Sequence, residues 1–151
     1  LQLYIDLELF RHYDKFTATV TAEEELLQND YKVPPLIVQP YVENAVNLGL
    51  KQKIKDRKIS IHFEQWSKKH VLCTIEDNGI GRQKAESIQK AKITAMVHES
   101  KGISIIKERL ELLQQKTGKP ASLEIKDMYI NNEATGTKVI ITIPYYNPEE
   151  S

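Results

Sequence analysis

The sequence of 151 residues has one cysteine, one tryptophan, two methionines and six glycines, and its acidic and basic residues cancel to a formal net charge of +0. A single cysteine, Cys73, cannot form an internal disulfide, which fits a reducing compartment. Without excess positive charge, we expect no nucleic-acid partner and no broad attraction to an anionic membrane. No apolar run reaches transmembrane length, and no signal-peptide pattern is present.

The chain has the length of one domain, and its 40% hydrophobic and 28% charged residues are ordinary for a globular protein. It begins without Met, in the stretch LQLYIDLELF, so we expect a piece of a longer protein. Apolar residues at helical spacing over residues 1–16 favour a helix there. Residues 82–100 are polar and lysine-rich with few core candidates, which predicts a mobile excursion from the fold.

Several stretches rich in β-branched and aromatic residues predict strands. They are FTATV, KISIHFEQW, HVLCTIE, SLEIKDMYI and TKVIITIPYY. The second and third stretches are joined through SKKH, and the last two through NNEATG. The pattern of ISIIKERLELLQQKTG predicts an amphipathic helix closed by Gly118. Helices and strands in this order favour an α+β fold, a two-layer α/β sandwich in which helices cover one face of a sheet.

The most informative stretch is PPLIVQPYVENAVNLGL, residues 34–50. On a helical wheel its apolar and polar side chains separate onto two faces, and Asn44 falls at the seam between them. The apolar face consists of Ile37, Val38, Tyr41, Val42, Ala45, Val46 and Leu48, and the polar face of Gln39, Glu43 and Asn47. Pro40 either begins this helix or kinks it, because proline in a helix interior costs about 3 kcal/mol.

A position at the seam allows two roles for Asn44. The amide can reach a groove at the edge of the sheet, where its carbonyl oxygen would ligate a hard cation. Alternatively, Asn44 is a boundary residue whose side chain bonds to nearby backbone. The stretch taken by itself favours the boundary role.

The second feature is EDNGIG, residues 76–81, at the end of a predicted strand. Asn-Gly commonly marks a hairpin turn, but the polar stretch RQKAESIQKAK follows here in place of a second strand. An aspartate at a strand end, Asp77, can accept a hydrogen bond from an exocyclic amine. Gly79 and Gly81 beside it allow the backbone to approach a flat ring closely.

Two weaker features lie further along the chain. Gly102 opens the predicted helix, whose exposed amides and dipole would suit a phosphate. Gly136 and Thr137 lead into the last predicted strand. Neither feature carries an assignment alone.

Together, in this order and spacing, the four pieces resemble the ATP-binding domain of the GHKL superfamily, which includes gyrase, ATP-driven chaperones, histidine kinases and MutL-type proteins. Within it, VPPLIVQPYVENAVNLGL is most similar to the LytS-type sensor histidine kinases, which typically read Pro-Pro, Gln-Pro and Val-Glu-Asn-Ala. The stretch LYIDLELFRHYDKF resembles the segment just after that family's phosphoacceptor helix. The resemblance covers nearly the whole chain and implies the Bergerat ATP-binding fold, with a mixed, mostly antiparallel sheet and helices on one face.

The resemblance also implies a domain division and two cofactors, ATP and Mg²⁺. Residues 1–16 would be the C-terminal part of the helical dimerisation and phosphoacceptor region, and residues 17–151 the catalytic domain. Asn44 matches the Asn that holds Mg²⁺ against the ATP phosphates. Glu43 beside it is a candidate catalytic carboxylate only by its position, because the helical wheel places it on the other face.

The base and phosphate contacts follow from the same resemblance. Asp77 matches the carboxylate that receives the adenine amino group, and Gly79 and Gly81 line the base. Thr137 matches the hydroxyl that joins Asp77 through water. The surviving glycine of the phosphate-side loop is Gly102, with residues 82–101 as the ATP lid.

The sequence departs from the family pattern at several positions. Asn47, counted among the nucleotide-binding residues, and Leu48 stand where the family often has Lys and His, so one cationic phosphate contact is missing. Ser100 replaces a usual glycine and Ile105 a usual Asn, which affects contacts on the lid side. The acceptor histidine of the family is not in this chain, since His12, His62, His70 and His98 lack its context and favour surface or strand positions.

The resemblance therefore implies a sensor histidine kinase that transfers the γ-phosphoryl group of ATP to a histidine upstream of this fragment. A nucleotide-sensing or inactive kinase domain that acts by binding and dimerisation is the alternative. A GHKL ATPase is less favoured, because Pro40 stands where a water-activating Glu is needed. Implied partners are a second copy of the full-length protein and a response regulator. The implied location is the cytoplasmic side of a bacterial inner membrane, reached only through the missing N-terminal part.

Overall fold

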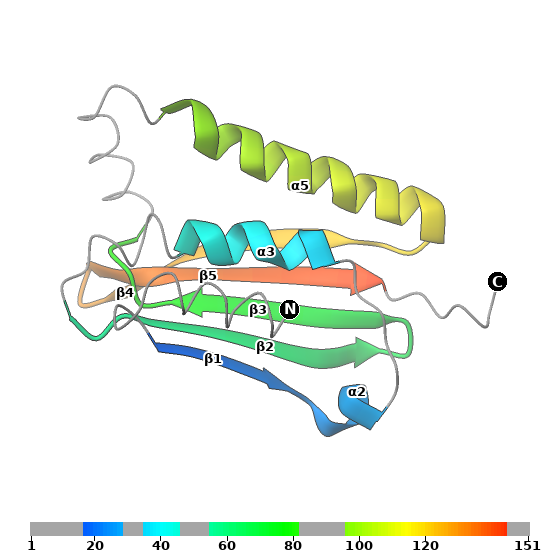
Figure 1. Ribbon diagram of the computed structural model, residues 1–151, viewed down its shortest axis with the longest axis horizontal. Coiled ribbons are helices and arrows are strands. Elements are labelled where there is room, and N and C mark those ends of the chain that lie inside the picture. The colour runs from blue at the N-terminus through cyan, green and yellow to red at the C-terminus, as the bar shows by residue number, and fades with distance from the viewer. Residues whose placement is uncertain (1–16, 29–34, 46–54, 82–95, 145–151) are drawn as a thin grey trace.

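The computed structural model describes residues 17–28, 35–45, 55–81 and 96–144 (Figure 1). The expectations for residues 1–16, for Asn47 and Leu48 and for residues 82–95 lie outside these ranges. The elements in chain order are β1 (Thr17–Ala22), α2 (Glu24–Gln28), α3 (Pro35–Asn44), β2 (Lys58–Ser67), β3 (His70–Asp77), α5 (Met96–Thr117), β4 (Ser122–Ile130) and β5 (Glu133–Pro144).

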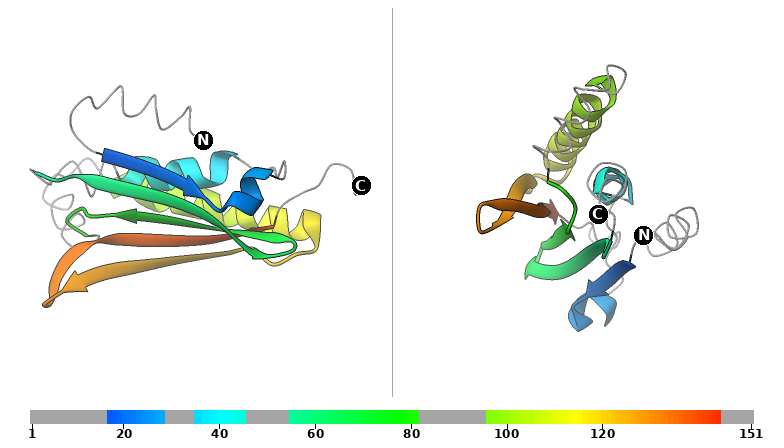
Figure 2. Two further views of the ribbon diagram at one scale, coloured as in Figure 1. Left: turned by 90° about the horizontal axis from the view of Figure 1, so that it is seen from below. Right: turned by 90° about the vertical axis from the view of Figure 1, so that its left-hand side faces the viewer.

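The strands form one sheet of five, in the order β1-β2-β3-β5-β4. β1 pairs with β2 in parallel, and the other three strand pairs are antiparallel. Figures 1 and 2 show α3 and α5 on the same side of this sheet, whereas α2 lies beside the edge strand β1. The predicted two-layer α/β sandwich with a mixed, mostly antiparallel sheet is therefore confirmed.

The central strand β3 shows why the sheet has one buried face. Its burial alternates along HVLCTIED, so that Val71, Cys73, Ile75 and Asp77 are buried and their neighbours are partly exposed. Successive side chains of a strand point to opposite faces, so the buried positions share one face. The first three are apolar, but the fourth is a carboxylic acid at the end of the strand.

The helices cover this face with apolar side chains at helical spacing. α3 contributes Val38, Tyr41 and Val42, with Ala45 just after it, and α5 contributes Ile106 and Leu110. They pack on the inward side chains of the central strands, including Ile59, Ile61, Cys73, Ile75, Val139, Ile141 and Ile143. No helix in the described part of the chain has the length and apolar character needed to cross a membrane.

Two predicted boundaries are wrong. The stretch NNEATG was expected to connect the last two strands, but β5 already begins at Glu133. Asn131 and Asn132 both have positive φ, of 50° and 64°, so they alone form the tight turn. The last helix was expected to begin after Gly102, but α5 begins at Met96. A lone glycine costs only about 1 kcal/mol inside a helix and does not have to end one.

Pro40, the third proline of the stretch 34–50, lies inside a helix. Pro40 is the sixth residue of α3, which begins at Pro35. The alternative in which Pro40 begins the helix is therefore wrong.

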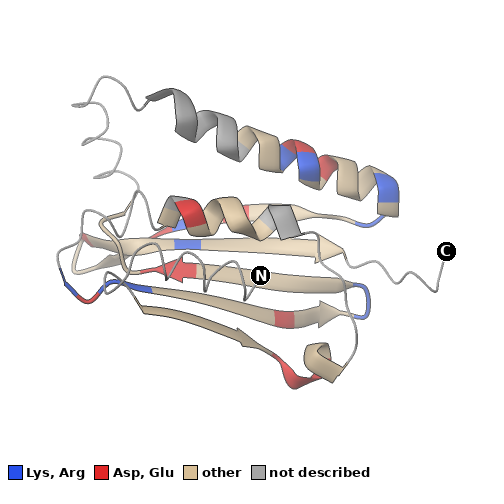
Figure 3. Cartoon of the chain, in the orientation of Figure 1, with Lys and Arg blue, Asp and Glu red and all other residues tan. Residues whose placement is uncertain are grey.

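Three ends of elements meet at one end of the molecule. The chain runs along α3 toward the same end of the sheet at which β3 finishes, and α5 begins above that end (Figure 1). α3 packs against both β3 and α5. Figure 3 shows acidic and basic residues interspersed over the described helices and strands. The fold thus brings Asn44, at the end of α3, and Asp77, at the end of β3, to one end of the sandwich.

Candidate nucleotide-binding site

Asp77 is the centre of the candidate site. It is the last residue of β3 and only 6% exposed, on the face of the sheet that the helices cover. The backbone N–H of Gly79 donates a hydrogen bond of 2.9 Å to Asp77 Oδ1. A carboxylate offers about four acceptor positions, so it can accept from a ligand in addition to the backbone. Burying a carboxylate is costly unless donors compensate it, which is typical of a position kept for function.

Thr137 lies directly across from Asp77. The two residues are partners in the antiparallel register between β3 and β5. Opposite residues of such a pair have Cβ atoms about 4.5–5.5 Å apart and point to the same face. The structure therefore brings together the carboxylate and the hydroxyl that the sequence assigns to the adenine end of the site.

Two glycines shape the space around the end of β3. Gly81 has φ of +82°, and a Cβ there would lie 2.9 Å from the Cβ of Ala134. Gly136 has φ of +142°, and a Cβ there would overlap the carbonyl oxygen of Asp77. Sequence reasoning treated Gly136 only as a weak signal before a strand. The structure places Gly136 inside β5, and a glycine inside a strand often marks such a close backbone approach.

Asn78 makes contacts that sequence reasoning missed. Its Oδ1 accepts a hydrogen bond of 2.7 Å from the backbone N–H of Lys58, and its Nδ2 donates one of 2.6 Å to the carbonyl of Asp56. Its own backbone N–H donates to the carbonyl of Lys58 at 3.1 Å. The Asn of the Asp-Asn-Gly sequence therefore ties the end of β3 to the beginning of β2.

The described residues offer the kinds of group that an adenine ring would use. An exocyclic amine is a donor, and Asp77 presents a buried acceptor for it. The glycine-rich backbone after Asp77 carries no side chains at Gly79 and Gly81 that would block the face of a flat ring. These are the features that hold a base by its edge and its faces.

The structure describes only part of the phosphate end of the candidate site. Asn44 is the last residue of α3, and its side chain is not among those described. Its neighbours behave as the helical wheel predicts, because Ala45 is buried and Glu43 is exposed. The Nε2 of Gln39 approaches Glu43 Oε1 at 3.5 Å, along the exposed side of the helix. Among the described residues, no group of three or more His, Cys, Asp or Glu side chains is placed to hold a metal ion.

The expectation for Gly102 does not hold in the form predicted. Gly102 and Ser100 both lie within α5, so Gly102 is not at the start of a helix. Amides inside a helix are already bonded to carbonyls one turn earlier, whereas those of the first turn are open to a phosphate. Ile105, in the place of a usual Asn, is 47% exposed.

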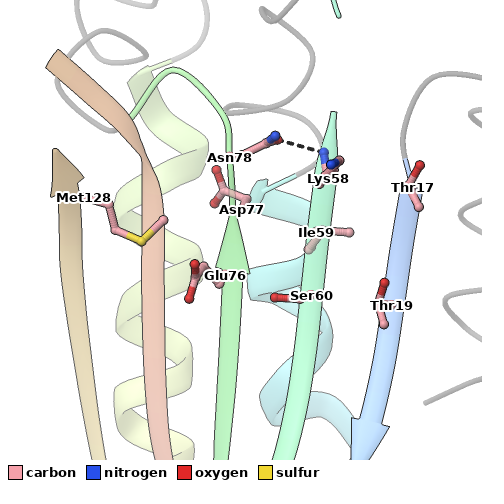
Figure 4. A pocket seen from close by; sticks show the side chains of 9 residues that line it. All are labelled: Thr17, Thr19, Lys58, Ile59, Ser60, Glu76, Asp77, Asn78 and Met128. Atoms are coloured by element: carbon pink, nitrogen blue, oxygen red, sulfur yellow. Dashed lines mark hydrogen bonds between the residues drawn. The ribbon is translucent and has the colours of Figure 1, made fainter. Parts of the chain in front are cut away.

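A separate hollow lies near the end of β3 but on the other face of the sheet. It has a volume of about 290 Å³ and is lined by Thr17, Thr19, Lys58, Ile59, Ser60, Glu76, Asp77, Asn78 and Met128. Figure 4 shows Thr19, Ser60 and Glu76 in front of the sheet, with the helices behind it. The Asp77 side chain shares the face of Ile75 and Cys73, so most of the lining of this hollow lies on the face opposite to its carboxylate.

Comparisons with known proteins bear on the fold and on the family that the chain resembles. No protein-family model matches the chain. It is 27% identical over 151 residues to the sensor histidine kinase/phosphatase LytS of Staphylococcus aureus, for example of strain Mu50 / ATCC 700699. The match covers 99% of this chain and 24% of the relative, so the chain spans about a quarter of the length of the curated relatives it matches.

Solved structures with the same fold include the histidine kinase domain of the blue-light activated histidine kinase of Erythrobacter litoralis EL346. It has a TM-score of 0.63 and 17% identity, over 95% of this chain and 58% of that one. The mycobacterial sensor histidine kinase MprB has a TM-score of 0.61 and 17% identity, over 95% of this chain and 91% of that one. The chain therefore has the fold of histidine kinase catalytic domains, and the resemblance to LytS-type sensor histidine kinases is confirmed.

Proposed function

We propose that this chain is the ATP-binding catalytic domain of a two-component sensor histidine kinase, which transfers the γ-phosphoryl group of ATP to a histidine outside residues 1–151. The observation that carries the proposal is the buried Asp77 carboxylate, set at the end of β3 beside Thr137. The likeness to LytS over 99% of the chain supports it. In this proposal residues 17–151 form the catalytic domain, and residues 1–16 end the helical dimerisation region.

At the adenine end, the chain supplies shape and one charged acceptor. Asp77 would accept a hydrogen bond from the exocyclic amine of adenine, and Gly79 and Gly81 would lie against the ring. Thr137, across the strand pair from Asp77, would share a water molecule with the base. A hydrogen bond to a charged group contributes about 1.5–3 kcal/mol, so Asp77 would account for much of the base recognition.

At the phosphate end, Mg²⁺ bound by Asn44 would neutralise charge on the ATP phosphates. Asn47 remains a proposed contact on that side, whereas Gly102 is proposed only as a residue without a side chain beside the phosphates, because its amide lies inside α5. Replacing Asn44 with Ala should therefore weaken Mg-ATP much more than adenosine, which has no phosphates to share the metal. Equal losses for the two ligands would favour the boundary role for Asn44.

Phosphoryl transfer depends mainly on positioning and charge stabilisation, with little covalent work for the protein. The chain would hold the base at Asp77 and leave the γ-phosphate directed toward the acceptor. Neither described strand histidine is arranged as that acceptor. His62 Nδ1 lies 2.7 Å from Thr21 Oγ1, and His70 Nδ1 lies 2.8 Å from Ser67 Oγ, so both are engaged within the sheet.

Two other functions use the same site. A nucleotide-sensing or inactive kinase domain would bind ATP without transfer, which the departures at Asn47, Ser100 and Ile105 favour. An ATPase of the GHKL type needs a base that activates water, and Pro40 lies inside α3 where that residue would stand. A positioned base is worth about 10²–10⁴-fold in rate, so hydrolysis is disfavoured.

The proposed partners are a response regulator and a second copy of the full-length protein. One structural neighbour, the histidine kinase ThkA, was solved in complex with the response regulator protein TrrA, at a TM-score of 0.54 and 15% identity. This supports a response regulator as partner by analogy of fold only. The proposed location is the cytoplasmic side of a bacterial inner membrane.

The test is transfer of γ-labelled phosphate from ATP. Incubated with its upstream phosphoacceptor helix, on one chain or as a separate segment, the protein should place acid-labile label on the histidine of that helix. The chain alone should bind ATP but take up no label. Asp77→Asn is the matched control, since it keeps the side-chain shape but removes the charge, and it should slow labelling.

The outcomes separate the three functions. ATP binding without any labelling of the supplied helix would favour the nucleotide-sensing domain. Rapid phosphate release by the chain alone would favour the ATPase. Label on the chain alone would show that the roles assigned to its histidines are wrong.

A further inference from the structure

The side chain of Asn78 bridges two strands behind the candidate base site. Its amide bonds to the backbone on both sides of Arg57, accepting from the N–H of Lys58 at 2.7 Å and donating to the carbonyl of Asp56 at 2.6 Å. Figure 4 shows Asn78 turned from β3 toward the beginning of β2, with the bond to Lys58 drawn. Oxygen and nitrogen of one amide are thus both satisfied by main-chain groups.

These bonds extend the β2–β3 ladder beyond its last register pair. Ile59 and Asp77 are the final partners of the two strands, and the backbone N–H of Asn78 adds one more bond, to the carbonyl of Lys58. Asp56 has a φ of +52°, which is uncommon for a residue other than glycine. The amide of Asn78 therefore satisfies a carbonyl in a conformation that the sheet alone would not fix.

The hydrogen bonds of the Asn78 amide to Asp56 and Lys58, called here the Asn78 clamp, also fix the direction of the neighbouring carboxylate. The peptide between Asp77 and Asn78 is held on one side by the bonds to β2. On the other side it packs against the bare backbone of Gly136 on β5. With both sides fixed, the Asp77 side chain is directed to the helix-covered face, where Gly79 N–H orients it. Releasing one side would let the end of β3 rotate and move the carboxylate.

We infer that Asn78 is a positioning residue for nucleotide binding, which acts on the base only through Asp77. This inference rests on the proposed function, because it assumes that Asp77 receives the adenine amine. Asn78 reaches β2 with its side chain, so its effect is transmitted by the backbone of β3. A merely structural role would lower stability without any special dependence on Asp77.

A double-mutant cycle with ADP separates these two roles. Asn78→Ala removes both amide bonds and should weaken ADP binding in calorimetry by about five- to tenfold, the value of roughly one net hydrogen bond. In an Asp77→Asn background, where the charged acceptor is already gone, the same substitution should cause little further loss. Ile143→Val, a conservative core change at the other end of the sheet, is the control for general destabilisation and should leave ADP affinity unchanged.

Amide hydrogen exchange reports the clamp directly. The N–H of Lys58 bonds to the Asn78 side chain, so it should be protected in the parent and exchange faster in Asn78→Ala. If Asn78→Ala does not fold, Asn78→Ser supplies a milder change, because a hydroxyl can replace only one of the two bonds. Its ADP affinity should lie between those of the parent and of Asp77→Asn.

Three results would overturn the inference. The first is unchanged ADP affinity in Asn78→Ala or Asn78→Ser. The second is a loss of ADP affinity from Asn78→Ala that is as large in the Asp77→Asn background as in the parent. The third is a loss of ADP affinity in Ile143→Val as large as that in Asn78→Ala. If Asp77→Asn alone leaves ADP affinity unchanged, the proposed placement of the base fails and the inference fails with it. A loss in Asp77→Asn without a loss in Asn78→Ala rejects the inference and leaves the proposed function standing.

Discussion

Gly136 provides a quantitative prediction, because a side chain at this position would clash with the backbone of Asp77, the residue that we place at the adenine. A Cβ at Gly136 would overlap the Asp77 carbonyl oxygen and lie 2.9 Å from its carbonyl carbon and 3.0 Å from Asn78 Cα. These are main-chain atoms of a paired strand, so they cannot move to relieve the clash as the flexible end of a side chain can. Gly136→Ala should therefore disturb both the sheet and the site.

The magnitude follows from two terms. Holding alanine at the φ of +142° found at Gly136 costs about 1–3 kcal/mol. Forcing an extra methyl group into close-packed surroundings costs about 1–3 kcal/mol more. Together these amount to roughly 2–6 kcal/mol, a large part of the about 5–15 kcal/mol that stabilises a typical domain.

Two other glycines of positive φ allow a comparison of stability, and Gly118, which has no assigned role in the site, is the matched control. Gly118 has φ of +64° with no atom within 4 Å of an added Cβ, so Gly118→Ala should cost only about 1–2 kcal/mol. Gly81→Ala meets the Ala134 Cβ at 2.9 Å and should fall between the two. Adding Ala134→Gly removes that Cβ and should recover the steric part of the loss.

Urea unfolding of the three variants measures their free energies of unfolding, and calorimetry measures their affinities for ADP. We expect stability to fall in the order Gly118→Ala, Gly81→Ala, Gly136→Ala, with ADP affinity lower in Gly136→Ala than in Gly118→Ala. Equal losses of stability for Gly118→Ala and Gly136→Ala would refute the close approach of β5 to the end of β3.

Three further predictions concern the core and the surface. Burial raises the pKa of the Cys73 thiol to about 12, so almost no thiolate exists at neutral pH and a thiol reagent should react only on unfolding; rapid labelling of the native protein would contradict this. Leu110→Ala, at a 4% exposed position, should cost about 2–5 kcal/mol in urea unfolding, whereas Leu112→Ala, at a 63% exposed position, should be near neutral; the reverse order would mean that α5 faces the other way. The Lys138–Glu76 pair, 3.7 Å apart and half exposed, should contribute at most about 1 kcal/mol, so a larger loss in Lys138→Gln at moderate salt would contradict it.

The sheet was predictable because its strands carry strong local signals. HVLCTIE has period-two burial with β-branched residues, and the structure places β3 at His70–Asp77. The antiparallel pairing followed from short connections such as SKKH. The early start of β5 was missed because Asn131 and Asn132 form a complete turn, so that the polar residues after them are free to pair.

The site was predictable only in part. The Asp-Asn-Gly motif and its place after a strand indicate Asp77, and the register that puts Thr137 across from it depends on how two distant strands pair. The clamp by Asn78 was not predictable, since its partners Asp56 and Lys58 lie about twenty residues earlier. The start of α5 was missed because one glycine has only a weak helix-breaking effect, and the helix runs through Gly102 from Met96.

The choice of nucleobase tests the central claim most directly. Adenine presents an amine where guanine presents a carbonyl, and a carbonyl facing the Asp77 carboxylate would place two acceptors together. Titration of the chain with ADP and GDP in calorimetry should therefore show clear preference for ADP, and Asp77→Asn should reduce that preference by weakening ADP. Equal affinity for the two nucleotides, or a preference unchanged in Asp77→Asn, would contradict the assignment of Asp77 to the base.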